Sequence, residues 1–278
     1  MAWNWLHSIF YGLMFGFSSL LPASPEAHER LFQELTGVEV MFGGFRISCR
    51  IGVLLALLVL CRKALHRLSQ ERRIARLPAR TRRRHPDQAA LRELRFLRTA
   101  AVPGVISTIL LRMLAVYIGP LWLLALVIAL CGVILYLPPY FRSGNKDENR
   151  SSGLDATLTG LSGGICSVPG LAGPAGMLTT ASLLGLDRQF AARMCQLLMV
   201  ILVPVMAALD VASIVIYHNA VFSVGWMMHY VLSAVTAFGG AYLGIMLLRF
   251  LAVRRGYSAF AYYCWALALF MFALYLLI

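Results

Sequence analysis

Long apolar blocks separated by short polar stretches constrain the fold of this chain more than any other feature of its sequence. Of the 278 residues, 60% are apolar and only 13% are charged, whereas soluble domains carry about 25% charged residues. A helix needs roughly 20 mainly apolar residues to cross the hydrocarbon core of a bilayer. Blocks of about that length predict membrane-spanning helices at 45–62, 99–117, 119–141, 191–214, 224–250 and 257–278. The sequence therefore predicts an all-α, polytopic membrane protein.

Two further apolar segments, 5–36 and 155–186, are interrupted by glycine, serine and proline. The first contains GFSSLLP (16–22) and the second GGICSVP (163–169), so their Gly, Ser/Cys and Pro positions match at an offset of 147 residues. Each interrupted segment precedes three predicted spans, and an odd number of spans inverts one half relative to the other. The pattern predicts an inverted-topology repeat, in which each half is a re-entrant helix pair plus three transmembrane helices.

This repeat sets the predicted organisation of the chain. Repeat 1 covers 1–141, a cytoplasmic linker covers 142–153, and repeat 2 covers 154–278. Residues 62–98 hold thirteen Lys and Arg against three acids, a net charge of +10 within the total of +13. We interpret this segment as a cytoplasmic loop that follows the positive-inside rule, in preference to a nucleic-acid patch.

The remaining charges favour a re-entrant path for the second interrupted segment. If 155–186 returns to the side it came from, a further set of basic residues joins loop 62–98 in the cytoplasm: Arg142, Lys146, Arg150, Arg188, Arg249, Arg254 and Arg255. The opposite side then receives 23–44, with Glu26, Glu29, Glu34 and Glu39, and the turn around His218 and Asn219. For the first interrupted segment, charge does not decide between a re-entrant pair and a single span.

Several stretches resemble the undecaprenyl-pyrophosphate phosphatases, bacterial membrane enzymes that recycle the lipid carrier of cell-wall synthesis. GFSSLLPASPEAH (16–28) is similar to the family's first signature, E-G-x-T-E-F-L-P-x-S-S-x-G-H, and 153–210 contains a counterpart of the second, P-G-x-S-R-S-G-x-T. Residues 45–63 resemble the span after the first signature, and SAFAYY (258–263) the start of the last span. The resemblance implies two re-entrant pairs that meet in a cavity open to the outer leaflet, where the family hydrolyses undecaprenyl pyrophosphate with a divalent metal.

The first signature survives only in part in this chain. Its histidine falls on His28 and its first serine on Ser24, so both are retained. Its two glutamates, second serine and glycine fall on Phe15, Ser19, Pro25 and Ala27. A divalent cation prefers carboxylate ligands, which Phe15 and Ser19 do not supply.

The second signature keeps its backbone break and loses its polar side chains. Its Pro-Gly is retained as Pro169 and Gly170. Its Ser-Arg-Ser falls on Ala172, Gly173 and Pro174, its threonine on Met177, and an arginine at the start of the family's last span on Cys264. Gly173 offers a backbone N–H at a predicted helix start, which remains a usable anion site. The scaffold for holding a phosphate is therefore kept, while the groups that cleave it are replaced.

Other charged residues appear where the family pattern has none: Arg46, Arg50, Arg112, Arg193 and Asp210. Charges within apolar blocks are costly and usually face a cavity or a partner. In one interpretation Arg50, alone or with Arg46, replaces the missing arginine, while Glu26 and His28 form a new acid/base or metal pair. In the other, Arg46 and Arg193 reach the lipid headgroups, and the remaining charges satisfy contacts between helices.

The candidate substrate-binding residues are Ser19, Ser24, His28, Arg50, Gly170 and Gly173, and the candidate catalytic residues are His28, Ser24 and Glu26. One hypothesis is a family member that binds a polyprenyl phosphate or pyrophosphate, and moves it across the membrane, without the usual catalytic residues. The alternatives are an active undecaprenyl-diphosphate phosphatase with a rebuilt site, using Mg²⁺ or Ca²⁺, and a transporter or scaffold for an unrelated ligand. We expect a multi-pass protein of a bacterial plasma membrane whose site faces the outer leaflet. We expect no nucleic-acid partner, and the sequence leaves a homodimer open.

Overall fold

A computed structural model describes most of the chain, namely residues 3–38, 43–81, 84–114, 120–137, 144–217, 223–254, 257 and 259–277. Within these ranges the chain forms ten α-helices and one short 3₁₀ turn, with an isolated β-bridge between Lys146 and Leu186 and no strand. Six residues considered above lie outside the described residues: Glu39, Arg142, His218, Asn219, Arg255 and Ser258. The expectation of an all-α protein is confirmed.

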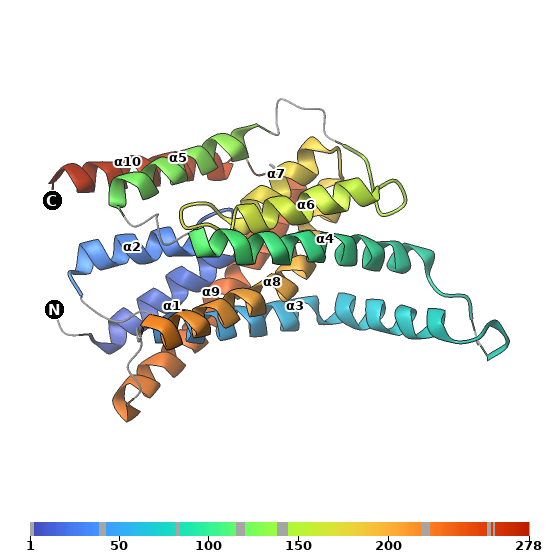
Figure 1. The fold of residues 1–278 in the computed structure, drawn as a ribbon, viewed down its shortest axis with the longest axis horizontal. Helices are drawn as coiled ribbons and strands as arrows, with labels where there is room; N and C mark the ends of the chain where they lie inside the picture. Colours follow the sequence, from blue (N-terminus) through green and yellow to red (C-terminus); the bar gives the residue numbers. More distant parts are fainter. Residues whose placement is uncertain are drawn as a thin grey trace.

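Each half of the chain contributes helices in a similar order of lengths (Figure 1). In the first half these are α1 (Trp5–Ser19), α2 (Pro25–Thr36), α3 (Gly43–Arg76), α4 (Gln88–Leu114) and α5 (Leu121–Tyr136). In the second half they are α6 (Gly153–Ile165), α7 (Gly173–Leu183), α8 (Arg188–Tyr217), α9 (Val224–Arg254) and α10 (Ala259–Leu277). In both halves two short helices are followed by two long ones and one of intermediate length.

In the described part of the chain, five helices are long and apolar enough to cross a membrane: α3, α4, α8, α9 and α10. The sequence predicts a sixth span at 119–141. There the structure has α5, an apolar helix of 16 residues, and residues on either side of it lie outside the described ranges. The structure is that of a multi-pass membrane protein with these candidate spans and one shorter apolar helix.

Both interrupted segments fold as a pair of helices with a break between them. In the first, Ser24 is the N-cap of α2 and Pro25 is its first residue, a position at which the fixed φ of proline favours the helix. In the second, Gly170 adopts a φ of 91°, a conformation that glycine reaches without the steric penalty of a Cβ. The breaks span 20–24 and 166–172, where the prolines and glycines of the sequence predict them.

The helices of the two halves interlock. α1 packs against α9 and α6 packs against α4, so that the first helix of each short pair lies against the fourth helix of the other half (Figure 1). Glycines allow these close crossings, because a Cβ at Gly16 would overlap the carbonyl of Ala237 and a Cβ at Gly160 that of Ala100. In Figure 1 the outer ends of α1 and α2 lie at the left, and those of α6 and α7 lie at the right. The two breaks therefore meet in the middle of the molecule.

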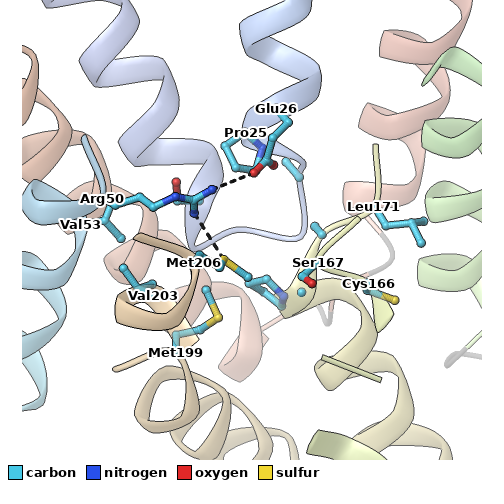
Figure 2. A pocket seen from close by; sticks show the side chains of 15 residues that line it. Pro25, Glu26, Arg50, Val53, Cys166, Ser167, Leu171, Met199, Val203 and Met206 are labelled. Carbon is cyan, nitrogen blue, oxygen red and sulfur yellow. Dashed lines mark hydrogen bonds and ion pairs between the residues drawn. The ribbon is translucent and has the colours of Figure 1, made fainter. Parts of the chain in front are cut away.

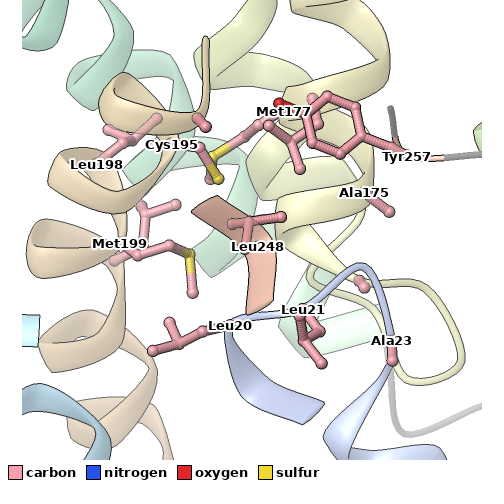
Figure 3. Packing of buried hydrophobic residues seen from close by; sticks show 14 of the residues in the cluster. Leu20, Leu21, Ala23, Ala175, Met177, Cys195, Leu198, Met199, Leu248 and Tyr257 are labelled. Atoms are coloured by element: carbon pink, nitrogen blue, oxygen red, sulfur yellow. The ribbon is translucent and has the colours of Figure 1, made fainter. Parts of the chain in front are cut away.

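A shared apolar core surrounds the first break. Leu20, Leu21 and Ala23 are almost fully buried in the same cluster as Met199 of α8 and Leu248 of α9, and Figure 3 shows Leu20 and Leu21 beside these two. Because these side chains enter the core, protein covers the open backbone of the break. Such cover is needed at membrane depth, where water is not available to hydrogen-bond free N–H and C=O groups.

The basic segment joins the far ends of α3 and α4, which project at the right of Figure 1. Buried acids at this end are paired with arginines. Glu71 is bonded to Arg84, and Glu93 lies 2.7 Å from Arg193 and 3.5 Å from Arg67. Arg193, for which headgroup contact is one interpretation of the sequence, therefore links α8 to α4 through Glu93.

Candidate functional site

A hydrogen bond joins the two helix breaks. The backbone N–H of Gly170 donates to Ser24 Oγ at 3.0 Å, although 146 residues separate the two. Ser24 Oγ also accepts from the N–H of Ala27 at 3.4 Å, as the N-cap of α2. The serine and the Pro-Gly that this chain shares with the phosphatase signatures thus hold the two breaks against each other.

A small cavity lies beside this junction (Figure 2). Its wall is formed by both breaks, by the start of α2 and by facing residues of α3 and α8. Four of the residues singled out from the sequence line it: Ser19, Glu26, Arg50 and Gly173. Ser24, Gly170 and His28 are not among the lining residues.

Four charged side chains, each from a different helix, form a closed cluster at the cavity. Glu26 Oε1 accepts from Arg50 Nη2 at 3.0 Å and from Arg112 Nη1 at 2.8 Å. Asp210 accepts from Arg50 Nε through Oδ2, and from Arg112 Nη2 through Oδ1 at 2.9 Å. The four side chains are only 4–12% exposed. An isolated charge in such surroundings is very costly. The two arginines and the two carboxylates therefore stabilise each other.

Arg50 directs one further donor towards the cavity. Its Nη1 donates to the thioether sulfur of Met206 at 3.3 Å (Figure 2). A thioether is a weak acceptor, so an anionic oxygen is a better partner for this N–H. The ring of Phe15, at the position of a signature glutamate, lies 5.6 Å from Arg50 Cζ and stabilises the guanidinium by a cation–π contact.

The start of α7 supplies another part of the wall. Its N-cap is Ala172, which has no side-chain hydrogen bond to the helix, whereas Ser24 caps α2. Pro174 in the first turn has no N–H, which leaves the N–H of Gly173 as the first donor of the helix. A helix N-terminus without a side-chain cap attracts anions through its free N–H groups and its dipole.

His28 is engaged by contacts outside the charge cluster. Its Nδ1 donates to the carbonyl of Ser24 at 2.6 Å, which places the proton on Nδ1. Its Nε2 then accepts from the hydroxyl of Tyr263, whose ring stacks on the imidazole. Among the described contacts, no hydrogen bond joins His28 to Glu26. His28 therefore ties α2 to α10, and the interpretation of Glu26 and His28 as an acid/base pair finds no support in these contacts.

A second buried ion pair lies about one turn further along α2. Glu29 accepts from Arg46 Nε at 2.9 and 3.0 Å, and from the hydroxyl of Tyr11 at 2.6 Å. Neither Glu29 nor Arg46 lines the cavity. Arg46, for which headgroup contact is one interpretation, is bonded to Glu29 within the protein, and its side chain remains 29% exposed.

The carboxylates of the site do not fit a divalent metal. In the part of the chain that the structure describes, no group of three or more His, Cys, Asp or Glu side chains is placed to hold an ion. Glu26 and Asp210 each accept from two guanidinium groups, whose positive charge repels a cation. The residues present thus differ from the metal chemistry that the family resemblance implies.

The sequence indicated the unusual charges but not their partners. Arg112 and Asp210 stand out as charges within apolar blocks. Nothing in their spacing indicates that Arg112 contacts Glu26, 86 residues away, and Asp210, 98 residues away. Met206 was not singled out, since a methionine is ordinary in an apolar helix, and Tyr263 was noted only as part of the stretch SAFAYY (258–263).

Comparisons with known proteins agree with the resemblance in the sequence. A family profile described as "Bacitracin resistance protein BacA" matches residues 8–270. The undecaprenyl-diphosphatase of Caldicellulosiruptor bescii is 27% identical over 272 residues, which cover 97% of each chain. That of Methanobrevibacter smithii is 24% identical over 275 residues, covering 96% of each chain. That of a Nocardioides species is 27% identical over 261 residues, covering 94% of this chain and 92% of the relative.

Proposed function

The chain belongs to the BacA family, and from that premise we propose that it binds a polyprenyl phosphate or pyrophosphate carrier lipid without hydrolysing it. The observation that carries the proposal is the closed cluster of Glu26, Arg50, Arg112 and Asp210 at the cavity. The name of the relatives, undecaprenyl-diphosphatase, supplies the class of lipid.

Arg50 supplies the attraction for the phosphate in this proposal. A phosphate oxygen replaces the sulfur of Met206 as the acceptor of Arg50 Nη1, since a charge-assisted hydrogen bond is roughly twice as strong as a neutral one. The uncapped N–H at Gly173 offers a second donor. Val53 and Val203, which also line the cavity, contact the first isoprene units of the lipid.

The same cluster argues against hydrolysis. Cleavage of a phosphoanhydride needs a base or nucleophile within hydrogen-bond reach of the reacting atoms, and positive charge on the transferred phosphoryl group. In the unliganded site, Glu26 and Asp210 are each held by two guanidinium groups, which leaves neither carboxylate free to take a proton from an attacking water. The Nε2 of His28 is occupied by Tyr263. Among the residues that the structure describes, the site keeps groups that attract a phosphate and has neither a free base nor a carboxylate available to a metal.

We also infer the inverted repeat and the two re-entrant pairs from the arrangement of the helices. The matching order of helix lengths, the exchanged packing of α1 on α9 and α6 on α4, and the Gly170–Ser24 hydrogen bond support this inference. With 62–98 in the cytoplasm, α1 and α2 open to the outside and α6 and α7 to the inside. This architecture suits alternating access, so the proposal includes movement of the lipid between the leaflets of a bacterial plasma membrane.

Lipid mass spectrometry and a phosphate-release assay test the proposal. We expect a C55 phosphate to co-purify with the wild-type protein and to be lost from Arg50→Ala. Arg46→Ala is the matched control, because it also removes an arginine of α3 that pairs with a buried glutamate, but one outside the cavity. We expect no phosphate release from undecaprenyl pyrophosphate with Mg²⁺ or Ca²⁺. Turnover that is abolished by Arg50→Ala or His28→Ala would instead establish an active phosphatase with a rebuilt site.

A further inference from the structure

The charges around the cavity are balanced before any ligand arrives. Arg50 and Arg112 carry two positive charges, and Glu26 and Asp210 carry two negative charges within the same set of contacts. A phosphomonoester brings about −1.5 to −2 further charges near pH 7. Excess charge in a buried site is strongly unfavourable, because little solvent is present to screen it. Binding of the phosphate therefore requires a compensating positive charge.

We propose that Glu26 takes up a proton when the lipid phosphate binds, so that lipid binding and proton binding are coupled at this site. This inference rests on the proposed function, because it names the exchange by which the same site accepts its anion. The proton comes from the buffered solvent, where a buffer acid becomes its conjugate base, and it forms an O–H bond on the Glu26 carboxyl group. The neutral carboxyl group releases the guanidinium N–H groups, and phosphate oxygens accept them in its place.

The two carboxylates of the cluster differ in a way that selects Glu26. Asp210 uses both of its oxygens, one for each arginine. Glu26 accepts both arginines through Oε1 alone, and its Oε2 accepts no hydrogen bond from another described residue. The side chain of Glu26 lines the cavity and is 12% exposed, whereas that of Asp210 does not line it and is 4% exposed. Glu26 can therefore receive a proton and a ligand from the cavity, while Asp210 holds both arginines in place.

Other titratable and charged groups surround Glu26 and its partners. Arg50 on α3 and Arg112 on α4 pair with Glu26, and Asp210 on α8 pairs with both arginines and lies near Arg46. Cys166 after α6 lines the cavity, and His28 on α2 lies near Glu26 and contacts Tyr263 on α10. Guanidinium groups stay charged, and cysteine and tyrosine ordinarily titrate above about pH 8. Burial lowers the pKa of His28, and its Nε2 already accepts the Tyr263 hydroxyl. An experiment on the coupling must still separate Glu26 from His28.

Calorimetry with undecaprenyl phosphate on the full-length protein in detergent measures the coupling. Titrations in two buffers with different ionisation enthalpies report the protons taken up for each lipid bound. The lipid phosphate itself binds a proton near pH 6, so the decisive quantity is the difference between the wild-type protein and Glu26→Gln. At pH 8 we expect the wild-type protein to take up about one proton more than this variant. For each unit by which the pH rises, the affinity of the wild-type protein for the lipid should fall about tenfold more than the affinity of Glu26→Gln.

Glu29→Gln provides the matched control. Glu29 is also a buried glutamate of α2 bonded to an arginine, but it does not line the cavity, so this variant should keep the wild-type proton uptake. If Glu26→Gln does not fold, ³¹P NMR of the lipid bound to the wild-type protein replaces it. A dianionic bound phosphate together with uptake of about one proton supports the proposal.

Two results overturn the coupling and leave the proposed function in place. One is binding with no proton uptake at pH 8, and the other is full uptake retained in Glu26→Gln, which would point to His28. A folded wild-type protein that binds no undecaprenyl phosphate between pH 6 and pH 8.5 would overturn both the coupling and the proposed function.

Discussion

The two helix breaks differ in what they present to the cavity between them. The break before α2 ends on a side-chain cap, Ser24, whose hydroxyl accepts from Ala27 and from Gly170. The break before α7 relies on the φ of 91° at Gly170 and ends on Ala172, which leaves the helix start uncapped. The first break thus ends in a side-chain hydroxyl that accepts hydrogen bonds, whereas the second ends in backbone N–H groups without a side-chain cap. Positive side-chain charge at this site therefore comes from the helices that face the breaks, above all from Arg50 of α3.

Removing an acid from the facing helices should have the largest effect. Asp210→Ala leaves Arg50 and Arg112 with one carboxylate between them, and breaking a buried ion pair costs about 3–5 kcal/mol. We expect a large fall in the melting temperature of the detergent-solubilised protein, measured by tryptophan fluorescence. Glu34→Ala removes the acid of an i,i+4 ion pair with exposed Arg30 and should cost about 1 kcal/mol or less. Equal melting temperatures for the two variants would show that the cluster does not hold the facing helices.

A change in the backbone conformation of the second break should have the next largest effect on stability. Gly170→Ala forces an alanine to a φ of 91° and brings its Cβ to 2.8 Å from Val127 Cγ1, a backbone strain of about 1–3 kcal/mol. We expect a lower melting temperature and less co-purified lipid. Gly153→Ala is the control, because no atom lies within 4 Å of the added Cβ. A Gly170→Ala protein as stable as this control would mean that the break tolerates other conformations.

Removing the side-chain cap of the first break should have the third largest effect on stability. Ser24→Ala removes the acceptor for the N–H groups of Ala27 and Gly170, and loss of an N-cap typically costs about 1–2 kcal/mol. Thermal unfolding should detect this loss, and Ser24→Thr, which retains the Oγ, should recover most of it. If Ser24→Ala and Ser24→Thr melt alike, the hydroxyl does not join the breaks.

Giving the second break the cap of the first should have the smallest effect. Ala172→Ser places a hydroxyl where it can accept from the first turn of α7, which should stabilise the helix by up to about 1 kcal/mol. The same hydroxyl competes with a phosphate for the free N–H groups, so we expect affinity for undecaprenyl phosphate to fall by about two- to fivefold. A more stable protein with unchanged affinity would show that the start of α7 does not contact the phosphate.

Much of the fold was predictable because it depends on local properties of the chain. Apolar blocks predicted the helices, and the two breaks were predictable because proline lacks an N–H and glycine tolerates a positive φ. The structure has those breaks at 20–24 and 166–172. The inverted repeat, read from matching motifs and span counts, stays a prediction supported by the order and packing of the helices.

The sequence predicted several residues of the site, but it did not predict which of them contact one another. Arg50 and Glu26 were singled out, and both line the cavity. Their pairing was not predicted: Glu26 was considered with His28, but the structure pairs it with Arg50 and Arg112. Arg50 was considered as a replacement for a lost arginine, and the structure also makes it the partner of Asp210.

By itself, the sequence determined where helices begin, where they break and which charges stand in apolar surroundings, because hydropathy, proline and glycine act over a few neighbouring residues. Only the tertiary structure decided which charges neutralise one another and which remain directed at the cavity. The contacts that decide this join residues 86, 98 and 160 positions apart. Periodic patterns in a sequence describe residues a few positions apart. They do not predict contacts at these separations, because such contacts depend on how the two halves of the chain pack.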